Sequence, residues 1–177
     1  GAHDNIIGGN EPGTGNIISG NGAHGMFIGS SFNTIQGNYI GVNVFGNAPL
    51  GNGQPDMALD QGDGIRIVTS EDDYAEGNYI VNNVISANTV NGIGIFSSDR
   101  NIIKNNFIGT DKDGNVDGLG NKNSGIKFGQ GPIIDNAVEN VIGGQAKTDC
   151  NTIAGNFSFG IELGPADHTT IEGNLIY

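Results

Sequence analysis

The chain has 177 residues and a net charge of −12, because 19 Asp and Glu residues outnumber 7 Lys and Arg residues. So acidic a surface argues against nucleic acid and anionic membranes as partners, since both recruit basic side chains. The chain is rich in glycine (32) and asparagine (25), and it has no apolar run long enough to span a membrane.

A hexapeptide of the form Asn-x-Ile-x-x-Asn recurs along the chain and indicates a solenoid. It occurs in full at residues 5–10, 16–21, 33–38, 38–43, 78–83, 83–88, 101–106 and 151–156. So short a repeat cannot bury its isoleucine alone, but stacked copies can bury it together. We expect the asparagines at corners, where each side chain can hydrogen-bond to its copies in the turns above and below.

A second motif, a glycine followed by apolar, any and apolar residues, opens each repeating unit. It occurs at residues 25–28, 64–67, 92–95, 125–128 and 160–163. The apolar pair points to one side of a strand, and two hexapeptide strands offset by five residues follow, as at residues 33–35 and 38–40. Three short strands per turn predict an all-β, three-faced parallel β-helix of five to six turns, with residues 1–177 as a single domain.

Two insertions interrupt this frame after corresponding strands. They span residues 41–52 and 109–121, and both end in Leu-Gly-Asn. Segments rich in glycine and asparagine between strands are typical of hairpins, so we expect two hairpin-like projections on the same side of the solenoid. Neither end shows an amphipathic capping helix, and we therefore expect a segment of a longer solenoid.

These motifs resemble those of the right-handed parallel β-helix repeat proteins of the pectate-lyase-like superfamily. The patterns that carry the likeness lie at residues 7–9, 15–21, 24–28 and 33–41, and long secreted bacterial surface proteins share them most fully. The resemblance implies a right-handed solenoid and an extracellular or cell-surface location. It leaves activity open, because the superfamily includes lyases, hydrolases, epimerases, adhesins and phage fibres.

Two columns on the glycine-led strands hold the candidate catalytic residues. The position before each glycine carries His24, Asp63, Asn91, Ser124 and Phe159, and the outward position within each strand carries Phe27, Arg66, Gly94, Lys127 and Glu162. Stacking should bring Asp63 beside His24 and near Arg66. An acid, a base and an arginine could support proton abstraction from a uronic acid, with the arginine offsetting the charge of the substrate carboxylate. The alternative interpretation is a surface ion pair.

The resemblance implies that enzymes of the superfamily place their catalytic groups on such a strand face. The motifs that those enzymes use are missing from this chain, which has no Asp-Pro-His, no strand-borne Asp-Asp pair and no Trp-x-Asp-His. Hydrolysis of a glycosidic bond needs two facing carboxylates, and no aligned strand pair supplies them.

Two acidic loops are candidates for Ca²⁺ binding. The second insertion spaces oxygen ligands at alternate positions, which are Asp111, Asp113, Asn115 and Asp117. Val116, however, stands where an EF-hand has its glycine. The other acidic stretch comprises Glu71, Asp72, Asp73 and Glu76. A polar turn and a solvated acidic loop are the alternatives. Cys150 is the only cysteine, which leaves no disulfide within the chain.

The outward positions of the second hexapeptide strands form an apolar column. We assign to it Tyr39, Val84, Phe107, Phe157 and Leu175 as candidate binding residues. A continuous exposed apolar stripe is unusual on a soluble protein, so the insertions, another chain or stacked sugar rings should cover it. Tyr39 and Phe107 lie just before the two insertions, which favours the first of these covers.

The regular repeat and the missing catalytic motifs favour a non-catalytic extracellular module, structural or adhesive, in a bacterial surface protein or filament. Its expected partners are polysaccharide or other copies of itself. The alternative is a lyase or epimerase that acts on an acidic glycan through His24, Asp63 and Arg66. A third hypothesis is a glycan-binding module without catalysis, which the apolar column permits.

Overall fold

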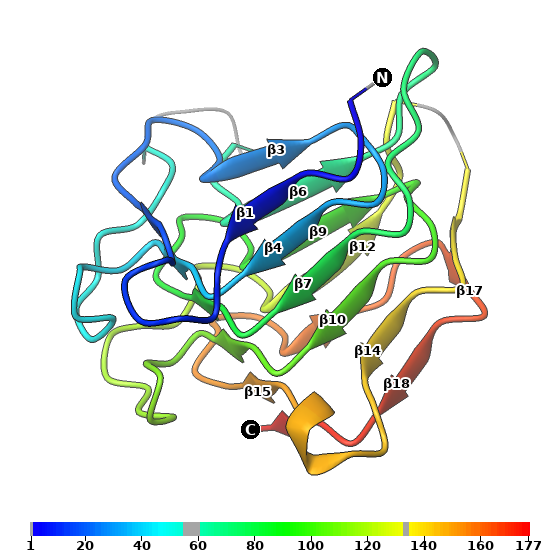
Figure 1. The fold of residues 1–177 in the computed structure, drawn as a ribbon. Helices are drawn as coiled ribbons and strands as arrows, with labels where there is room; N and C mark the ends of the chain where they lie inside the picture. The colour runs from blue at the N-terminus through cyan, green and yellow to red at the C-terminus, as the bar shows by residue number, and fades with distance from the viewer. Residues whose placement is uncertain (1, 55–60, 133–134) are drawn as a thin grey trace.

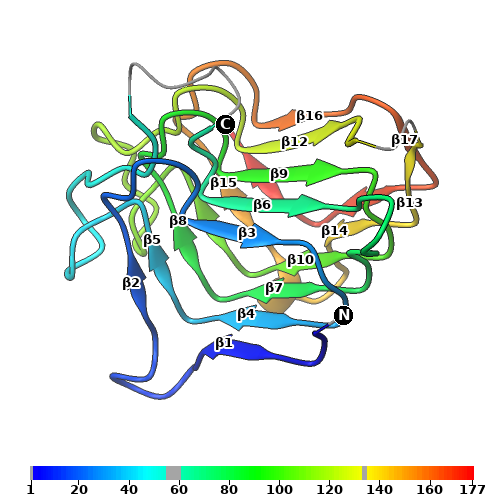
Figure 2. The same ribbon diagram turned by 90° about the horizontal axis from the view of Figure 1, so that it is seen from above.

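The structure, a computed structural model, describes residues 2–54, 61–132 and 135–177. Within these residues, the regular elements are short β-strands and one 3-10 helix, η1 (Lys147–Asp149). No helix in the described residues is long and apolar enough to cross a membrane. The strands form three large parallel sheets and one small pair, and Figures 1 and 2 show them from two directions.

Each large sheet collects one strand from every turn. Sheet I contains β3 (Met26–Ile28), β6 (Ile65–Val68), β9 (Ile93–Phe96), β12 (Ile126–Gly129) and β16 (Ile161–Glu162). Sheet II contains β1 (Ile6–Gly8), β4 (Thr34–Gln36), β7 (Tyr79–Val81), β10 (Ile102–Lys104), β14 (Val141–Gly143) and β18 (Thr170–Glu172). Sheet III contains β2 (Ile17–Ile18), β5 (Tyr39–Ile40), β8 (Val84–Ile85), β11 (Phe107–Ile108), β15 (Thr152–Ile153) and β19 (Leu175–Ile176).

The chain visits sheets I, II and III in rotation, which makes it a three-faced parallel β-helix. Strands β1 and β2 form a partial turn, and five turns follow from β3 onward. The small pair joins β13 (Ala137–Val138) to β17 (Ala166–Asp167), which lie between the sheet I and sheet II strands of the last two turns. Figure 2 shows the sheet I strands stacked as successive rungs. The predicted fold class is confirmed.

The isoleucines of the repeat stack in register inside the solenoid. In sheet II, Ile35 aligns with Ile80 and Ile80 with Ile103. In sheet III, Ile85 aligns with Ile108. These side chains are fully buried in one continuous core. Burial of an isoleucine stabilises folding by about 1.5–3 kcal/mol, so each turn depends on apolar contacts that only its neighbours can supply.

Three asparagine ladders run along the corners, as the sequence predicts. In each ladder, the Oδ1 atom of one asparagine accepts hydrogen bonds from the Nδ2 atom and the backbone N–H of the copy one turn earlier. The three ladders comprise Asn5, Asn33, Asn78, Asn101 and Asn140; Asn16, Asn38, Asn83, Asn106, Asn151 and Asn174; and Asn21, Asn52, Asn88, Asn121 and Asn156.

Asn106 illustrates why the corner requires an amide. Its Oδ1 atom accepts hydrogen bonds from the backbone N and the Nδ2 of Asn83, both at 3.0 Å. Its Nδ2 atom lies within 3.0 Å of three acceptors, which are the backbone oxygens of Ile80 and Lys104 and the Oδ1 atom of Asn151. A carboxylate of the same shape has no donor for these three oxygens.

A glycine in the left-handed region begins each insertion. Gly41 has a φ of +83° and Gly109 a φ of +87°, and a Cβ on either would lie 2.1 Å from a backbone oxygen of the next turn. Glycine alone permits both the backbone conformation and the close approach. The insertion can therefore leave the solenoid without separating the stacked turns.

Both insertions project beside sheet III and cover part of it. The first is a hairpin, closed by an antiparallel bridge between Val42 and Pro49. The second folds back through a hydrogen bond from the backbone N of Asp111 to the oxygen of Asn115. Val42 from the first insertion and Leu119 from the second pack with Val84, and Tyr39 and Phe107 lie against this cluster. Cover by the insertions, the favoured expectation, is confirmed at Val84.

The amide ladder predicts a specific response to Asn106→Asp. This change removes the three hydrogen bonds that Nδ2 donates and places a buried negative charge against three oxygen acceptors. It should lower the free energy of unfolding by about 3 kcal/mol. Asn105→Asp, at the neighbouring and more exposed position, should cost well under half of that. Urea unfolding followed by circular dichroism measures both, and equal losses in the two variants would contradict the proposed role of the ladder.

Candidate functional site

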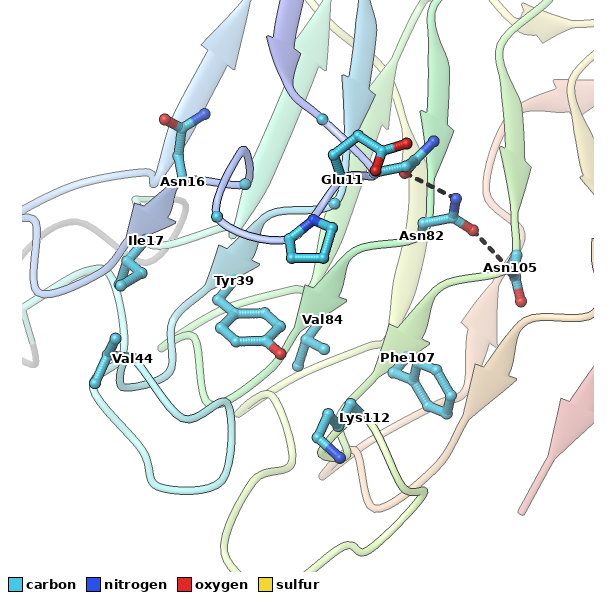
Figure 3. A pocket seen from close by; sticks show the side chains of 16 residues that line it. Glu11, Asn16, Ile17, Tyr39, Val44, Asn82, Val84, Asn105, Phe107 and Lys112 are labelled. Carbon is cyan, nitrogen blue, oxygen red and sulfur yellow. Dashed lines mark hydrogen bonds between the residues drawn. The ribbon is translucent and has the colours of Figure 1, made fainter.

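A groove over sheet III brings together three of the sequence-predicted binding residues. It has a volume of about 590 Å³, and its lining includes Tyr39, Val84 and Phe107. Strand register places these residues at one position of three successive turns. Because neighbouring strands lie about 4.8 Å apart, Tyr39 and Phe107 are separated by about 10 Å along the solenoid axis. Figure 3 shows the three side chains in a row.

The groove walls come from the first turn and from the insertions. The connection between β1 and β2 contributes Glu11, while Val44 and Lys112 belong to the first and second insertions. Figure 3 shows these residues around the apolar row. Among the described lining residues, Glu11 and Lys112 carry charge. Lys112 lies 2.8 Å from the carboxylate of Asp113, and the hydrogen bond from Lys112 to this carboxylate raises the pKa of Lys112.

A row of amides forms one rim of the groove. Asn105 donates through Nδ2 to the Oδ1 atom of Asn82 at 2.6 Å, and Asn82 donates to Asn10 at 2.9 Å. Asn82 and Asn105 occupy the same corner of consecutive turns, both with a positive φ that asparagine tolerates. Sequence reasoning missed this rim. Its signal was the doublets Asn82-Asn83 and Asn105-Asn106, in which the second asparagine serves the buried ladder and the first faces outward.

Two members of the predicted apolar column lie outside the groove, and one of these assignments is wrong. Phe107 aligns with Thr152 and not with Phe157, whereas Leu175 aligns with Thr152 in the last turn. Phe157 lies beyond the corner, where its backbone N donates to the oxygen of Asn121 and its side chain is 82% exposed. The signal was present in the sequence, because Phe157 is followed by Ser158 and not by the isoleucine that marks a strand.

The predicted catalytic residues also meet, but around a buried carboxylate. The Nδ1 atom of His24 accepts a hydrogen bond from the backbone N of Asp63 at 3.1 Å and lies 3.6 Å from its Oδ2 atom. Arg66 donates to the same Oδ2 at 3.1 Å, and Asn91 donates to Oδ1 through its backbone N and its Nδ2. The Asp63 side chain is fully buried. It therefore offers no surface to a polymeric substrate.

The surroundings of Asp63 are those of a structural ion pair. The guanidinium of Arg66 lies 4.0 Å from the centre of the Phe96 ring, a cation–π contact. Gly94 leaves the space for this arrangement, because a Cβ there would lie 2.9 Å from Asp63 and 2.6 Å from Phe96. Burial raises the pKa of Asp63, although the hydrogen bonds from Asn91 and the charges of His24 and Arg66 act in the opposite direction.

The predicted calcium loop holds its first acidic residue by hydrogen bonds within the loop. The Oδ1 atom of Asp111 accepts from the backbone N of Asp113 and of Asn115, and its Oδ2 atom accepts from the Nδ2 of Asn115. Burial raises the pKa of Asp111, but these hydrogen bonds outweigh it, so the pKa lies below its ordinary value. The carboxylates of Asp113 and Asp117 do not join Asp111, since no group of three or more acidic, His or Cys side chains converges within the described residues.

The other acidic stretch is an exposed loop that contributes one ion pair. Residues 71–74 are exposed, and Glu76 accepts a hydrogen bond from Arg100 of the next turn. Lys127 and Glu162, the remaining charged pair of the sheet I column, lie 2.8 Å apart. Calcium binding at either acidic loop remains a prediction.

Comparisons with protein-family models, with curated proteins and with solved structures give no match to this chain. The parallel solenoid is therefore a result of the structure, and the likeness to pectate-lyase-like proteins is one of sequence motifs. The features of the structure that bear on function are the groove and the cluster around Asp63.

The raised pKa of Asp63 predicts how Asp63→Asn behaves with pH. The folded state holds this proton to a higher pH than the unfolded state, for which the ordinary value is 3.8. The stability that the protonated group contributes is complete below 3.8 and is lost as the pH rises through the folded-state pKa. An asparagine cannot ionise, so the stability of the variant relative to the wild type should rise over that interval.

Urea unfolding of the wild type and of Asp63→Asn across a pH series measures this difference. A constant or falling difference for Asp63→Asn would show that burial does not dominate at Asp63.

Proposed function

We propose that this chain is a non-catalytic, extracellular β-helical module that contacts polysaccharide through the groove over sheet III. The observation that carries the proposal is the row of Tyr39, Val84 and Phe107 beside the amide rim. Ligand sites combine apolar and aromatic surface with a few polar groups that fix orientation. Sugar rings match this combination, because they present C–H faces to aromatic rings and hydroxyls to amides.

The structural part of the proposal rests on the solenoid itself. Three asparagine ladders and a continuous isoleucine core make a rigid support for the groove, and rigid elements hold a binding surface more precisely than loops do. The extracellular location rests on the resemblance to secreted bacterial β-helix proteins. The catalytic alternative has weaker support, because the side chain of Asp63 is fully buried.

Substitution of the groove aromatics tests the proposal. The purified protein should be retained by at least one polysaccharide in a panel of neutral and acidic glycans, measured by pull-down and by affinity electrophoresis. Tyr39→Ala and Phe107→Ala should each weaken this binding about tenfold or more, because each removes a ring at the centre of the contact.

The matched control is Phe27→Ala on sheet I. The Phe27 side chain is 63% exposed and lies outside the groove lining, so its loss should leave glycan binding unchanged. Retention by no polysaccharide would contradict the proposal. So would unaltered binding by both groove variants.

A further inference from the structure

The groove is periodic along the solenoid axis. Its lining residues come from four successive turns: residues 9–13 and 15–17 from the first, Tyr39 from the second, Val84 and Asn82 from the third, and Phe107 and Asn105 from the fourth. One residue per turn supplies the floor, so the groove repeats about every 4.8 Å. A ligand that fills it must run parallel to the axis, and a linear polymer with a matching repeat satisfies every turn.

Aromatic rings occupy only alternate turns of the floor. Tyr39 and Phe107 flank Val84, which is 3% exposed beneath Val42 and Leu119. The ring contacts are therefore two strand spacings apart, about 10 Å. An extended 1,4-linked pyranose chain advances by about one strand spacing per sugar, so this interval corresponds to a disaccharide.

We propose that the groove takes an extended, uncharged β-1,4-linked polysaccharide chain, with every second sugar ring packed against Tyr39 or Phe107. This inference rests on the proposed function and names the ligand class. In a β-1,4-linked chain, successive rings are turned over, so every second ring presents the same C–H face. The alternation of aromatic and aliphatic turns fits that geometry.

The amide rim supplies the complementary polar contacts. Asn82 and Asn105 stand one turn apart, joined by a hydrogen bond of 2.6 Å. An amide carries two donor protons and an acceptor oxygen with two lone pairs, so each retains capacity for sugar hydroxyls beyond the bond between them. The row follows the axis, as do the aromatic rings, and the two rows can contact consecutive sugars of one chain.

Charge favours an uncharged polymer over a uronic acid polymer. The chain carries a net charge of −12, which repels a polyanion. Lys112 is the one cation among the described lining residues, and it is paired with Asp113, while Glu11 adds a negative charge. No cluster of basic side chains is present in this lining to neutralise a row of carboxylates.

Calorimetric titration with defined oligosaccharides tests the ligand class. Uncharged β-1,4-linked hexasaccharides of glucose, N-acetylglucosamine, mannose and xylose are compared with hexasaccharides of galacturonic acid and mannuronic acid, and with a β-1,3-linked glucan hexasaccharide. We expect at least one uncharged β-1,4 ligand to bind most tightly, and about tenfold more tightly than its own disaccharide, because a disaccharide reaches only one aromatic ring.

The outcomes separate this inference from the proposed function. Tighter binding of a uronate or of the β-1,3 glucan, or affinity independent of length, would overturn the ligand class and leave glycan binding intact. Failure of every oligosaccharide and polysaccharide to bind would overturn both.

Loss of one aromatic ring tests the two-ring contact directly. Tyr39→Leu and Phe107→Leu each keep an apolar side chain on the floor but remove one ring, and each should bind the best hexasaccharide about tenfold more weakly than the wild type does, because one ring contact remains. Tyr39→Phe and Phe107→Tyr keep both rings in place and should stay within about twofold of the wild type. Wild-type affinity for the hexasaccharide in both leucine variants would contradict the two-ring contact, and a melting curve confirms that each variant is folded.

Discussion

The structure depends on hydrogen bonds to the buried polar groups at its corners. Between its three sheets, the backbone bends three times per turn, and buried polar groups at the bends need partners that the sheets do not supply. The side-chain amide of asparagine provides them, because it accepts from one turn while it donates to another and to a backbone oxygen. Where Thr169 takes the place after Asn140, its hydroxyl is buried without a hydrogen bond, and the ladder stops.

Alignment by the ladders determines the surface as well as the core. Because every turn is held in register, a position in the repeat becomes a column on the outside of the solenoid. One such column, with Tyr39, Val84 and Phe107, forms the floor of a groove. Another, before the glycine-led strands, places Asp63 against His24. Similar stacking thus produced a groove over sheet III and a buried ion pair before the strands of sheet I.

The periodic part of the fold could be predicted from the sequence. The spacing of the isoleucines predicts the turns, and the positions of the asparagines predict the corners, because both signals repeat with little variation. The predicted strand register is wrong where the repeat loses its pattern. Phe157 was assigned to a strand, but the isoleucine that marks a strand does not follow it. Cover of Val84 by the insertions was expected from their place in the sequence, but the residues that provide it, Val42 and Leu119, could not be predicted because they depend on how the insertions pack.

The site itself was only partly predictable. Tyr39 and Phe107 could be assigned to one column from their place in the repeat. The proximity of His24, Asp63 and Arg66 could be predicted in the same way. The groove walls could not, because Glu11 and Lys112 are far apart in the sequence and meet the floor only through loop conformations. The burial of Asp63 was equally hidden, since it depends on Asn91, Gly94 and Phe96 in the neighbouring turn.

Hydrogen exchange of side-chain amides tests the corner ladders most directly. Nuclear magnetic resonance resolves the Nδ2 protons of individual asparagines, so Asn83 and Asn106 in a buried ladder can be compared with Asn47 at an exposed hairpin tip. The ladder amides should exchange at least about a hundredfold more slowly than Asn47, because exchange requires neighbouring turns to separate. Exchange of Asn83 and Asn106 at the rate of Asn47 would show that the corners are open to water and that these ladders do not hold the turns together.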